Sequence, residues 1–220
     1  MNELLIPTKI TKTHRKTLSL IINNTGELIV RAPLNYKDSV IFDFINKKAN
    51  WIIKKRTDML KSSIQPLKII DGEEINLLGK NYLINLSNVK SVKVKDNVLV
   101  VPTENSKTRL ISYLKRTLKK FIEEKIFKIN QVYTFKYNQV SISSAKTNWG
   151  SCSGKNNLHF TYKLIFCPEQ VIDYIIVHEL VHTIIKNHSK TYWSNVRRIY
   201  PYYKECEKWL KENRGLVNIL

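Results

Sequence analysis

The most informative residues of the chain are His178-Glu179-Leu180-Val181-His182-Thr183-Ile184-Ile185-Lys186-Asn187-His188. They contain an H-E-x-x-H motif, with a further histidine six residues after the second one. Side chains four residues apart project from one face of a helix, about 5–6 Å from each other. The imidazoles of His178 and His182 can therefore reach one ion at about 2.0–2.1 Å each. The spacing predicts a zinc site on a helix.

Glu179 follows the first histidine directly, so its carboxylate can lie beside the metal without binding it. A carboxylate in that place can accept a proton from a water that the metal has acidified, which makes Glu179 the candidate general base. Three neutral histidines would leave the fourth tetrahedral position to water, whereas structural zinc sites use four protein ligands. The motif therefore favours a catalytic zinc site with one ion.

A third histidine ligand requires the chain to turn back after His182. On an uninterrupted helix, His188 would stand about 9 Å further along the axis. Asn187 tolerates the left-handed conformation that ends helices, and Ser189 is a good N-cap for a following helix. We therefore expect the turn to use Asn187 and His188 to complete the site.

Other third ligands stay open at this stage. If metal binding survives the loss of the third histidine, Glu205 and Glu207 are the carboxylates to consider. A donor that stabilises the oxyanion of the reaction is also expected, with Tyr192 and Tyr162 as the candidates.

Length and composition limit the class of protein. The 220 residues suit one sizeable domain or two small ones. No run of 18 apolar residues occurs and no basic and apolar leader opens the chain, so we expect neither a membrane span nor export. The three cysteines are odd in number and show no C-x-x-C spacing, so neither a disulfide framework nor a cysteine zinc site is indicated. The predicted compartment is a reducing cytoplasm.

The net charge of +19 arises from 37 Lys and Arg against 18 Asp and Glu. Such an excess favours acidic partners, including nucleic acid. The basic residues are spread along the chain, and a solvated helix face is the default explanation for the densest group. That group is Lys107, Arg109, Lys115, Arg116, Lys119, Lys120, Lys125 and Lys128.

Alternating and helical patterns predict an α+β fold. Residues 18–22 and 27–31 alternate around an Asn and Gly turn, which predicts a β-hairpin, and residues 37–61 then follow a helical pattern. Residues 66–101 contain short strands that suggest an antiparallel meander. We place a domain boundary between residues 103 and 104, which gives an N-terminal α/β region, 1–103, and a catalytic domain, 104–220.

The second domain begins with a predicted helix from residue 105 or 106 to about 130. Strands are expected at 139–143, around 149–152 and at 157–162. The helix of the histidine motif follows from Pro168, and two further helical stretches, 189–199 and 202–213, complete the chain. The strands at 149–162 thus come shortly before the motif helix.

Short blocks along nearly the whole chain match a known family. They are Arg15-Lys16-Thr17-Leu18, Val30-Arg31-Ala32-Pro33, Trp51-Ile52, Gly72-Glu73, Leu78-Gly79-Lys80-Asn81-Tyr82, Trp149-Gly150-Ser151-Cys152-Ser153, and His178 through Trp193. In these blocks the chain resembles the YgjP-like metallopeptidase domains, relatives of the SprT-type zinc proteases. The resemblance implies a compact zincin-like domain with an H-E-x-x-H helix, zinc on His178, His182 and His188, and a catalytic Glu179.

The chain departs from the family pattern at three positions. Asn148 stands where a basic residue is common, and Thr161 stands where an asparagine is usual. Ile185 holds the offset at which metzincins carry the glycine of their turn. The first two departures concern substrate contacts more than metal binding.

Residues 149–153 allow two interpretations. As a strand beside the motif helix they would leave an edge that pairs with an extended peptide, with Trp149, Gly150, Ser151 and also Tyr192 as substrate contacts. Alternatively, they form a bulge or turn packed around a core tryptophan. The sequence alone does not separate these readings.

Three functions follow from these observations. The first is a zinc-dependent hydrolase, most simply a peptidase acting on a peptide or protein. The second keeps the metal but cleaves a nucleotide phosphoanhydride, which the positive charge would favour. The third is a basic nucleic-acid-binding protein whose metal site is structural or vestigial.

Overall fold

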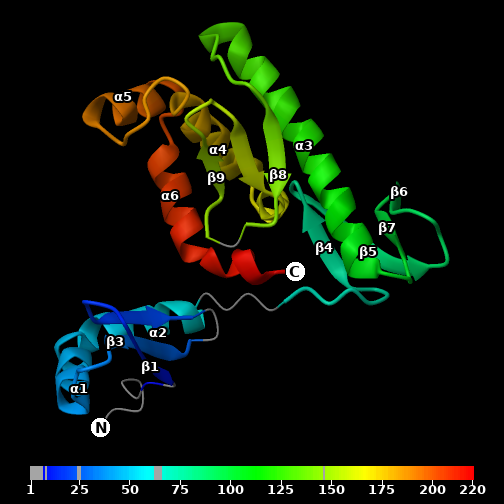
Figure 1. The fold of residues 1–220 in the computed structure, drawn as a ribbon. Helices are drawn as coiled ribbons and strands as arrows, with labels where there is room; N and C mark the ends of the chain where they lie inside the picture. Colours follow the sequence, from blue (N-terminus) through cyan, green and yellow to red (C-terminus); the bar gives the residue numbers. More distant parts are fainter. Residues whose placement is uncertain (1–6, 8, 24–25, 62–65, 146) are drawn as a thin grey trace. The chain divides into compact units, whose positions relative to one another are not determined.

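The computed structural model describes residues 7, 9–23, 26–61, 66–145 and 147–220, and the chain forms two compact units, Met1–Ile64 and Gln65–Leu220 (Figure 1). The boundary expected between residues 103 and 104 falls inside the second unit. It lies between β7 (Val98–Pro102) and α3 (Ser106–Tyr133), which contact each other. The change in pattern there marks the passage from strand to helix, whereas the two units divide after Ile64.

The first unit is a three-stranded sheet with two helices. Its strands are β1 (Lys9–Thr13), β2 (Ser19–Ile22) and β3 (Leu28–Pro33), in the order β1-β3-β2. The predicted antiparallel pairing of β2 with β3 is confirmed, although residues 24–25 of its turn lie outside the described part. Strand β1, which runs parallel to β3, was not expected.

The helical pattern of residues 37–61 forms two helices, α1 (Asp38–Lys47) and α2 (Ala49–Lys61), where one was predicted. The core of the unit joins alternate residues of β3 to both helices. It consists of Leu28, Val30, Ala32, Ile41, Ile45 and Ile52.

The second unit opens with a four-stranded sheet, in the order β4-β5-β7-β6. Its other strands are β4 (Glu74–Leu77), β5 (Lys80–Ser87) and β6 (Lys93–Lys95). The predicted antiparallel meander is wrong at one step, because β5 and β7 are parallel neighbours and β6 pairs with the outer edge of β7. Residues 68–70, part of the stretch 66–101 in which short strands were predicted, form no strand.

Helix α3 joins this sheet to the rest of the unit. Every fourth residue along most of its length is apolar and fully buried, which gives a continuous stripe on one side. The stripe consists of Leu110, Leu114, Leu118, Ile122 and Ile126. Through it α3 contacts β7, the strand β8 (Val140–Ser143), the 3-10 helix η2 (Tyr162–Phe166) and α4 (Glu169–Val181).

The third sheet lies next to α4 and has the order β8-β10-β9. Strand β10 (Leu158–Thr161) is central, parallel to β8 and antiparallel to β9 (Gly150–Cys152). Helix α4 also contacts α5 (Lys190–Ile199) and α6 (Tyr203–Glu212), and η3 (Arg214–Asn218) follows α6. None of the described helices is long and apolar enough to cross a membrane.

Candidate metal centre

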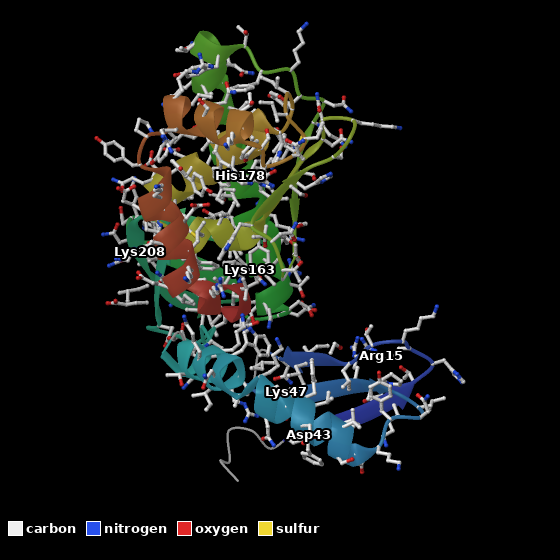
Figure 2. All side chains as sticks on the ribbon, turned by 90° about the vertical axis from the view of Figure 1, so that its left-hand side faces the viewer. Arg15, Asp43, Lys47, Lys163, His178 and Lys208 are labelled. Carbon is white, nitrogen blue, oxygen red and sulfur yellow. The ribbon has the colours of Figure 1, made fainter. Side chains whose placement is uncertain are left out.

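Helix α4 carries His178 and Glu179 of the site, and His182 is its C-cap. Its N-cap is Pro168, and Glu169 in the first turn interacts favourably with the helix dipole. Most of its later side chains are apolar and buried, so the helix is enclosed on nearly every side. The buried residues are Val171, Ile172, Tyr174, Ile175, Ile176, Val177, Glu179, Leu180 and Val181. A helix held in this way fixes the position of His178, which Figure 2 labels. The same holds for Glu179, the next residue of the helix.

The helix ends earlier than expected. Val181 is its last residue, and His182 is the C-cap, still with right-handed helical dihedral angles. The amide of His182 donates to the carbonyl of His178 at 3.3 Å, so the two side chains keep the four-residue spacing of a helix. A short turn over residues 182–184 then redirects the chain.

The turn does not use a left-handed residue. Among the described residues other than glycine, positive φ angles occur at Leu78, Asp96, Asn105, Thr134 and Asn156. Asn187 is not one of them, so the predicted role of its backbone is wrong. Donors in the turn satisfy the last carbonyls of the helix instead. The Thr183 hydroxyl donates to the carbonyl of Leu180 at 2.7 Å, and the Ile185 amide donates to the carbonyl of Val181 at 3.0 Å.

The predicted cap of the next helix is confirmed. The hydroxyl of Ser189 accepts a hydrogen bond from the amide of Tyr192 at 3.4 Å and so begins α5. The side chain of Asn187 accepts from the amide of Ser189 at 3.3 Å. Asn187 therefore acts through its side chain, and His188 is held between the turn and α5.

The three histidines converge on one point. Nε2 of His188 lies 3.2 Å from Nε2 of His182 and 3.3 Å from Nε2 of His178. Ligand atoms of all three lie within 4.8 Å of one another. Ligands arranged tetrahedrally about 2.0–2.1 Å from zinc are about 3.3–3.4 Å apart. The separations of the imidazole nitrogens therefore fit one metal ion bound by His178, His182 and His188.

The protonation of the rings fits the same role. Nδ1 of His182 lies 3.0 Å from the carbonyl oxygen of Ile185, which can only accept, so this nitrogen carries the hydrogen and Nε2 is left with its lone pair. Burial, and then the neighbouring His182 and His188, lower the pKa of His178 to about 3. Burial is also the largest cause that lowers the pKa of His182. Both imidazoles are neutral at pH 7, as metal ligands must be.

Glu179 is buried beside this cluster. The residue is 4% exposed, and among the described residues its Oε2 has no hydrogen-bond partner. Burial raises its pKa to about 8. A cation bound by the histidines would favour the ionised carboxylate. The carboxylate is thus an unsatisfied acceptor placed one residue from the first ligand, as the motif predicts for a general base.

Gly150 brings strand β9 close to that carboxylate. A Cβ atom at Gly150 would lie 2.6 Å from Oε1 and 2.8 Å from Cγ of Glu179. Such a separation is well below van der Waals contact, so the glycine leaves the room that Glu179 occupies. The group that approaches Gly150 closely is therefore the side chain of Glu179.

Residues Gly150–Cys152 form an edge strand of the third sheet. Of the two interpretations of this segment, a strand or a bulge or turn, the structure has the strand. Phe160 pairs with Gly150, and Ser151 pairs with His159, both on the side of β10. Trp149, just before the strand, accepts a hydrogen bond from the amide of Thr161 at 3.0 Å. Trp149, Gly150 and Ser151 are all partly exposed beside α4.

Tyr192, predicted as a substrate contact and as an oxyanion donor, lies beside the histidines. It is fully buried, and its ring stacks on that of His182 with centroids 4.4 Å apart. Its hydroxyl donates to the backbone carbonyl of His178 at 3.1 Å. Tyr192 therefore supports two ligands from inside the protein. The other oxyanion candidate, Tyr162, is also buried, with its hydroxyl 3.5 Å from the carbonyl oxygen of Leu220.

Three contacts at the site were not expected from the sequence. The hydroxyl of Tyr174 lies 3.4 Å from Nδ1 of His178 and 3.2 Å from Oε1 of Glu207. The ammonium of Lys186 donates to the carbonyl of Ser153 at 2.9 Å, and so ties the histidine loop to the turn after β9. Tyr174 stands four residues before His178, a spacing that could have suggested the first contact.

Cys152 shows no sign of activation. Its Sγ lies 3.5 Å from the ammonium of Lys186, but burial is the largest influence and raises the pKa of the thiol. The structure thus favours a packed thiol over a nucleophile. Cys167 and Cys206 are free and buried.

The basic group on α3 is partly used within the molecule. Arg109 donates to the carbonyl of Lys90 at 2.6 Å, and Lys125 pairs with Asp173 at 3.0 Å and with Glu169. Lys119 lies 3.7 Å from Glu123 on the same helix. Part of this basic group therefore stabilises the fold. Binding of acidic partners stays a prediction from the net charge.

The comparisons with known proteins agree with the site. No curated protein and no solved structure matches the chain. The family described as "YgjP-like, metallopeptidase domain" matches residues 16–213, which include both the β9 strand and all three histidines. The chain, with its three-histidine candidate metal site, therefore belongs to the YgjP-like metallopeptidase domain family.

Proposed function

We propose that the protein is a zinc-dependent peptidase with a zincin-like catalytic domain. The observation that carries this proposal is the convergence of three Nε2 atoms, with separations of 3.2 and 3.3 Å, next to the buried carboxylate of Glu179. Three imidazoles leave one tetrahedral position open, which is the arrangement of catalytic zinc sites. The family of the chain supports the same class of reaction.

His178, His182 and His188 would hold the ion. When bound, zinc supplies a Lewis acid that polarises the scissile carbonyl and lowers the pKa of the attacking water. Glu179 accepts the proton of that water and then delivers it to the leaving amine. Because its Oε2 has no hydrogen-bond partner in the described part of the chain, the carboxylate is free to make the hydrogen bond that this transfer requires.

Strand β9 offers a place for the substrate. It is an edge strand, so the backbone groups on its outer side can pair with an extended peptide. Gly150 sets this strand directly against Glu179. A peptide added to the edge would therefore run past the general base, with Trp149 and Ser151 as neighbouring contacts.

The test is hydrolysis of an unstructured protein by the purified zinc-loaded enzyme, with and without a chelator. Glu179→Gln should retain stoichiometric zinc and lose about 10²–10⁴-fold in rate, the usual contribution of a general base. Cleavage at the wild-type rate by this variant would remove Glu179 from the mechanism.

The same preparation separates the other two functions. Nucleoside triphosphates in place of protein test the phosphoanhydride hydrolase. Salt-sensitive binding of DNA or RNA that survives zinc removal tests the nucleic-acid-binding protein. Both stay predictions from the charge of the chain, and no contact within the site favours them over the peptidase. The cytoplasm stays the predicted compartment, consistent with three free cysteines.

A further inference from the structure

A line of polar contacts leads from the outer nitrogen of His178 to another helix. Tyr174, one turn earlier on α4, places its hydroxyl 3.4 Å from Nδ1 of His178. The same hydroxyl lies 3.2 Å from Oε1 of Glu207 on α6. The rings of Tyr174 and His178 meet edge to face, with centroids 5.8 Å apart. Helix α6 contributes no histidine to the cluster, but through these contacts it reaches a ligand.

The direction of these hydrogen bonds follows from what each group can donate. A carboxylate only accepts, so the single hydroxyl proton of Tyr174 goes to Glu207. The hydroxyl oxygen is then left to accept from His178, so Nδ1 must carry the hydrogen.

This arrangement selects one tautomer of the ligand. With the hydrogen on Nδ1, the lone pair of a neutral imidazole is on Nε2, and Nε2 is the atom that faces the other histidines. The carbonyl of Ile185 fixes the tautomer of His182 in the same way, because it accepts a hydrogen bond from Nδ1 of that ring. Partners of this kind fix the orientation of metal-bound histidines and make them better ligands.

We propose that Tyr174 and Glu207 are positioning residues that hold His178 in the tautomer and orientation needed to bind the metal. This inference rests on the proposed function, because it assumes a metal at the three histidines. Glu207 acts as the carboxylate end of the line. It is not part of the cluster of potential ligands in the described residues, although the sequence left it open as a third ligand.

The first experiment replaces the hydroxyl alone. We expect Tyr174→Phe to bind zinc about 10-fold to 100-fold more weakly than the wild type in competition with a chelator, the usual cost of losing such a partner. The control is Tyr200→Phe, because the Tyr200 hydroxyl also donates to α4, at the carbonyl of Gln170 and a distance of 2.9 Å. The control should bind zinc like the wild type.

The second experiment tests whether Glu207 acts through Tyr174. Glu207→Ala should weaken zinc binding, whereas Glu212→Ala, at another exposed position of the same helix, should not. The double variant, Tyr174→Phe with Glu207→Ala, should bind zinc no more weakly than Tyr174→Phe alone. Independent effects that multiply in the double variant would overturn the relay.

A spectroscopic measurement of the His178 tautomer distinguishes a positioning role of Tyr174 from a general loss of structure. In metal-free protein with ¹⁵N-labelled histidine, His178 should show hydrogen on Nδ1, and Tyr174→Phe should shift its tautomer balance toward Nε2. An unchanged tautomer, or zinc affinity equal to the wild type, overturns the inference while the proposed function stands. A wild-type protein that binds no zinc at the three histidines overturns both. Glu207→Ala, at an exposed position, keeps the test decisive if Tyr174→Phe does not fold.

Discussion

Gly150 and Glu179 are in such close contact that the glycine cannot gain a side chain without displacing the carboxylate. A Cβ atom would stand 2.6 Å from Oε1, 2.8 Å from Cγ and 3.0 Å from Cδ of Glu179. All three atoms belong to the side chain that we assign as general base. Glu179 can therefore occupy this position only because Gly150 on the neighbouring strand has no Cβ atom.

We expect Gly150→Ala to lose about 10²-fold in the rate of peptide hydrolysis, because displacements near 1 Å can cost that much. Zinc content should stay stoichiometric, since the histidines are not displaced. The matched control is Gly154→Ala, where a Cβ would have no neighbour within 4 Å. A Gly150→Ala variant as active as Gly154→Ala would contradict the placement of Glu179.

His188→Ala should lose stoichiometric zinc in elemental analysis of the purified protein, because only two ligands would remain. His14→Ala, at an exposed position in the first unit, is the control and should keep the ion. Retained zinc in His188→Ala would point to a different third ligand, and Glu205 and Glu207 would be the next positions to replace.

The metal-free protein should depend on pH through Glu179. Its pKa of about 8 in the folded state lies above the ordinary value of 4.5, so the folded state binds the proton more tightly than the unfolded one. This contribution to stability is complete below about pH 4.5 and is lost as the pH rises through 8. Urea unfolding at several pH values should therefore show that Glu179→Gln gains stability relative to the wild type between pH 5 and 9. A constant difference across that range would contradict the burial of a titrating carboxylate.

Ser189→Ala should lower the free energy of unfolding by about 1 kcal/mol, the usual cost of an N-cap. The reason is the loss of the hydrogen bond from the Tyr192 amide to the Ser189 hydroxyl. Ser112→Ala is the control, because its hydroxyl donates to a carbonyl within α3, at Thr108 and 2.9 Å, and caps no helix. Equal stability of the two variants in urea would argue against the cap.

The parts of the fold that sequence patterns predict are those set by near neighbours in the chain. The apolar stripe of α3 repeats every fourth residue, so its helix was predicted, and the alternation around residues 18–31 predicted the β2 and β3 hairpin. The parallel neighbours were missed, because the pairing of β1 with β3 and of β5 with β7 leaves no local signal. The strand Lys93–Lys95 lies within residues 66–101, where short strands were predicted, although all three of its residues are exposed.

In the site, too, the features that depend on residues close together in the chain were predicted and the others were missed. The spacing of His178, Glu179 and His182 depends on one helix turn, and the structure keeps that spacing even though the helix ends at Val181. The end itself was misplaced, because backbone and hydroxyl donors from Thr183 to Ile185 satisfy the helix carbonyls without a left-handed residue. Glu207 stands 33 residues from Tyr174, so no pattern along the chain could have joined them.

The enclosure of α4 limits where evolution can adjust the protein. His178 and Glu179 lie on a helix whose side chains are mostly buried, so mutations of the residues around them disturb the core. His188 comes instead from an exposed loop, in which Ile184 is 67% exposed. Related proteins that adapted to another ion, or to slower exchange of the same one, should therefore differ first in residues 183–187, with the helix left as it is.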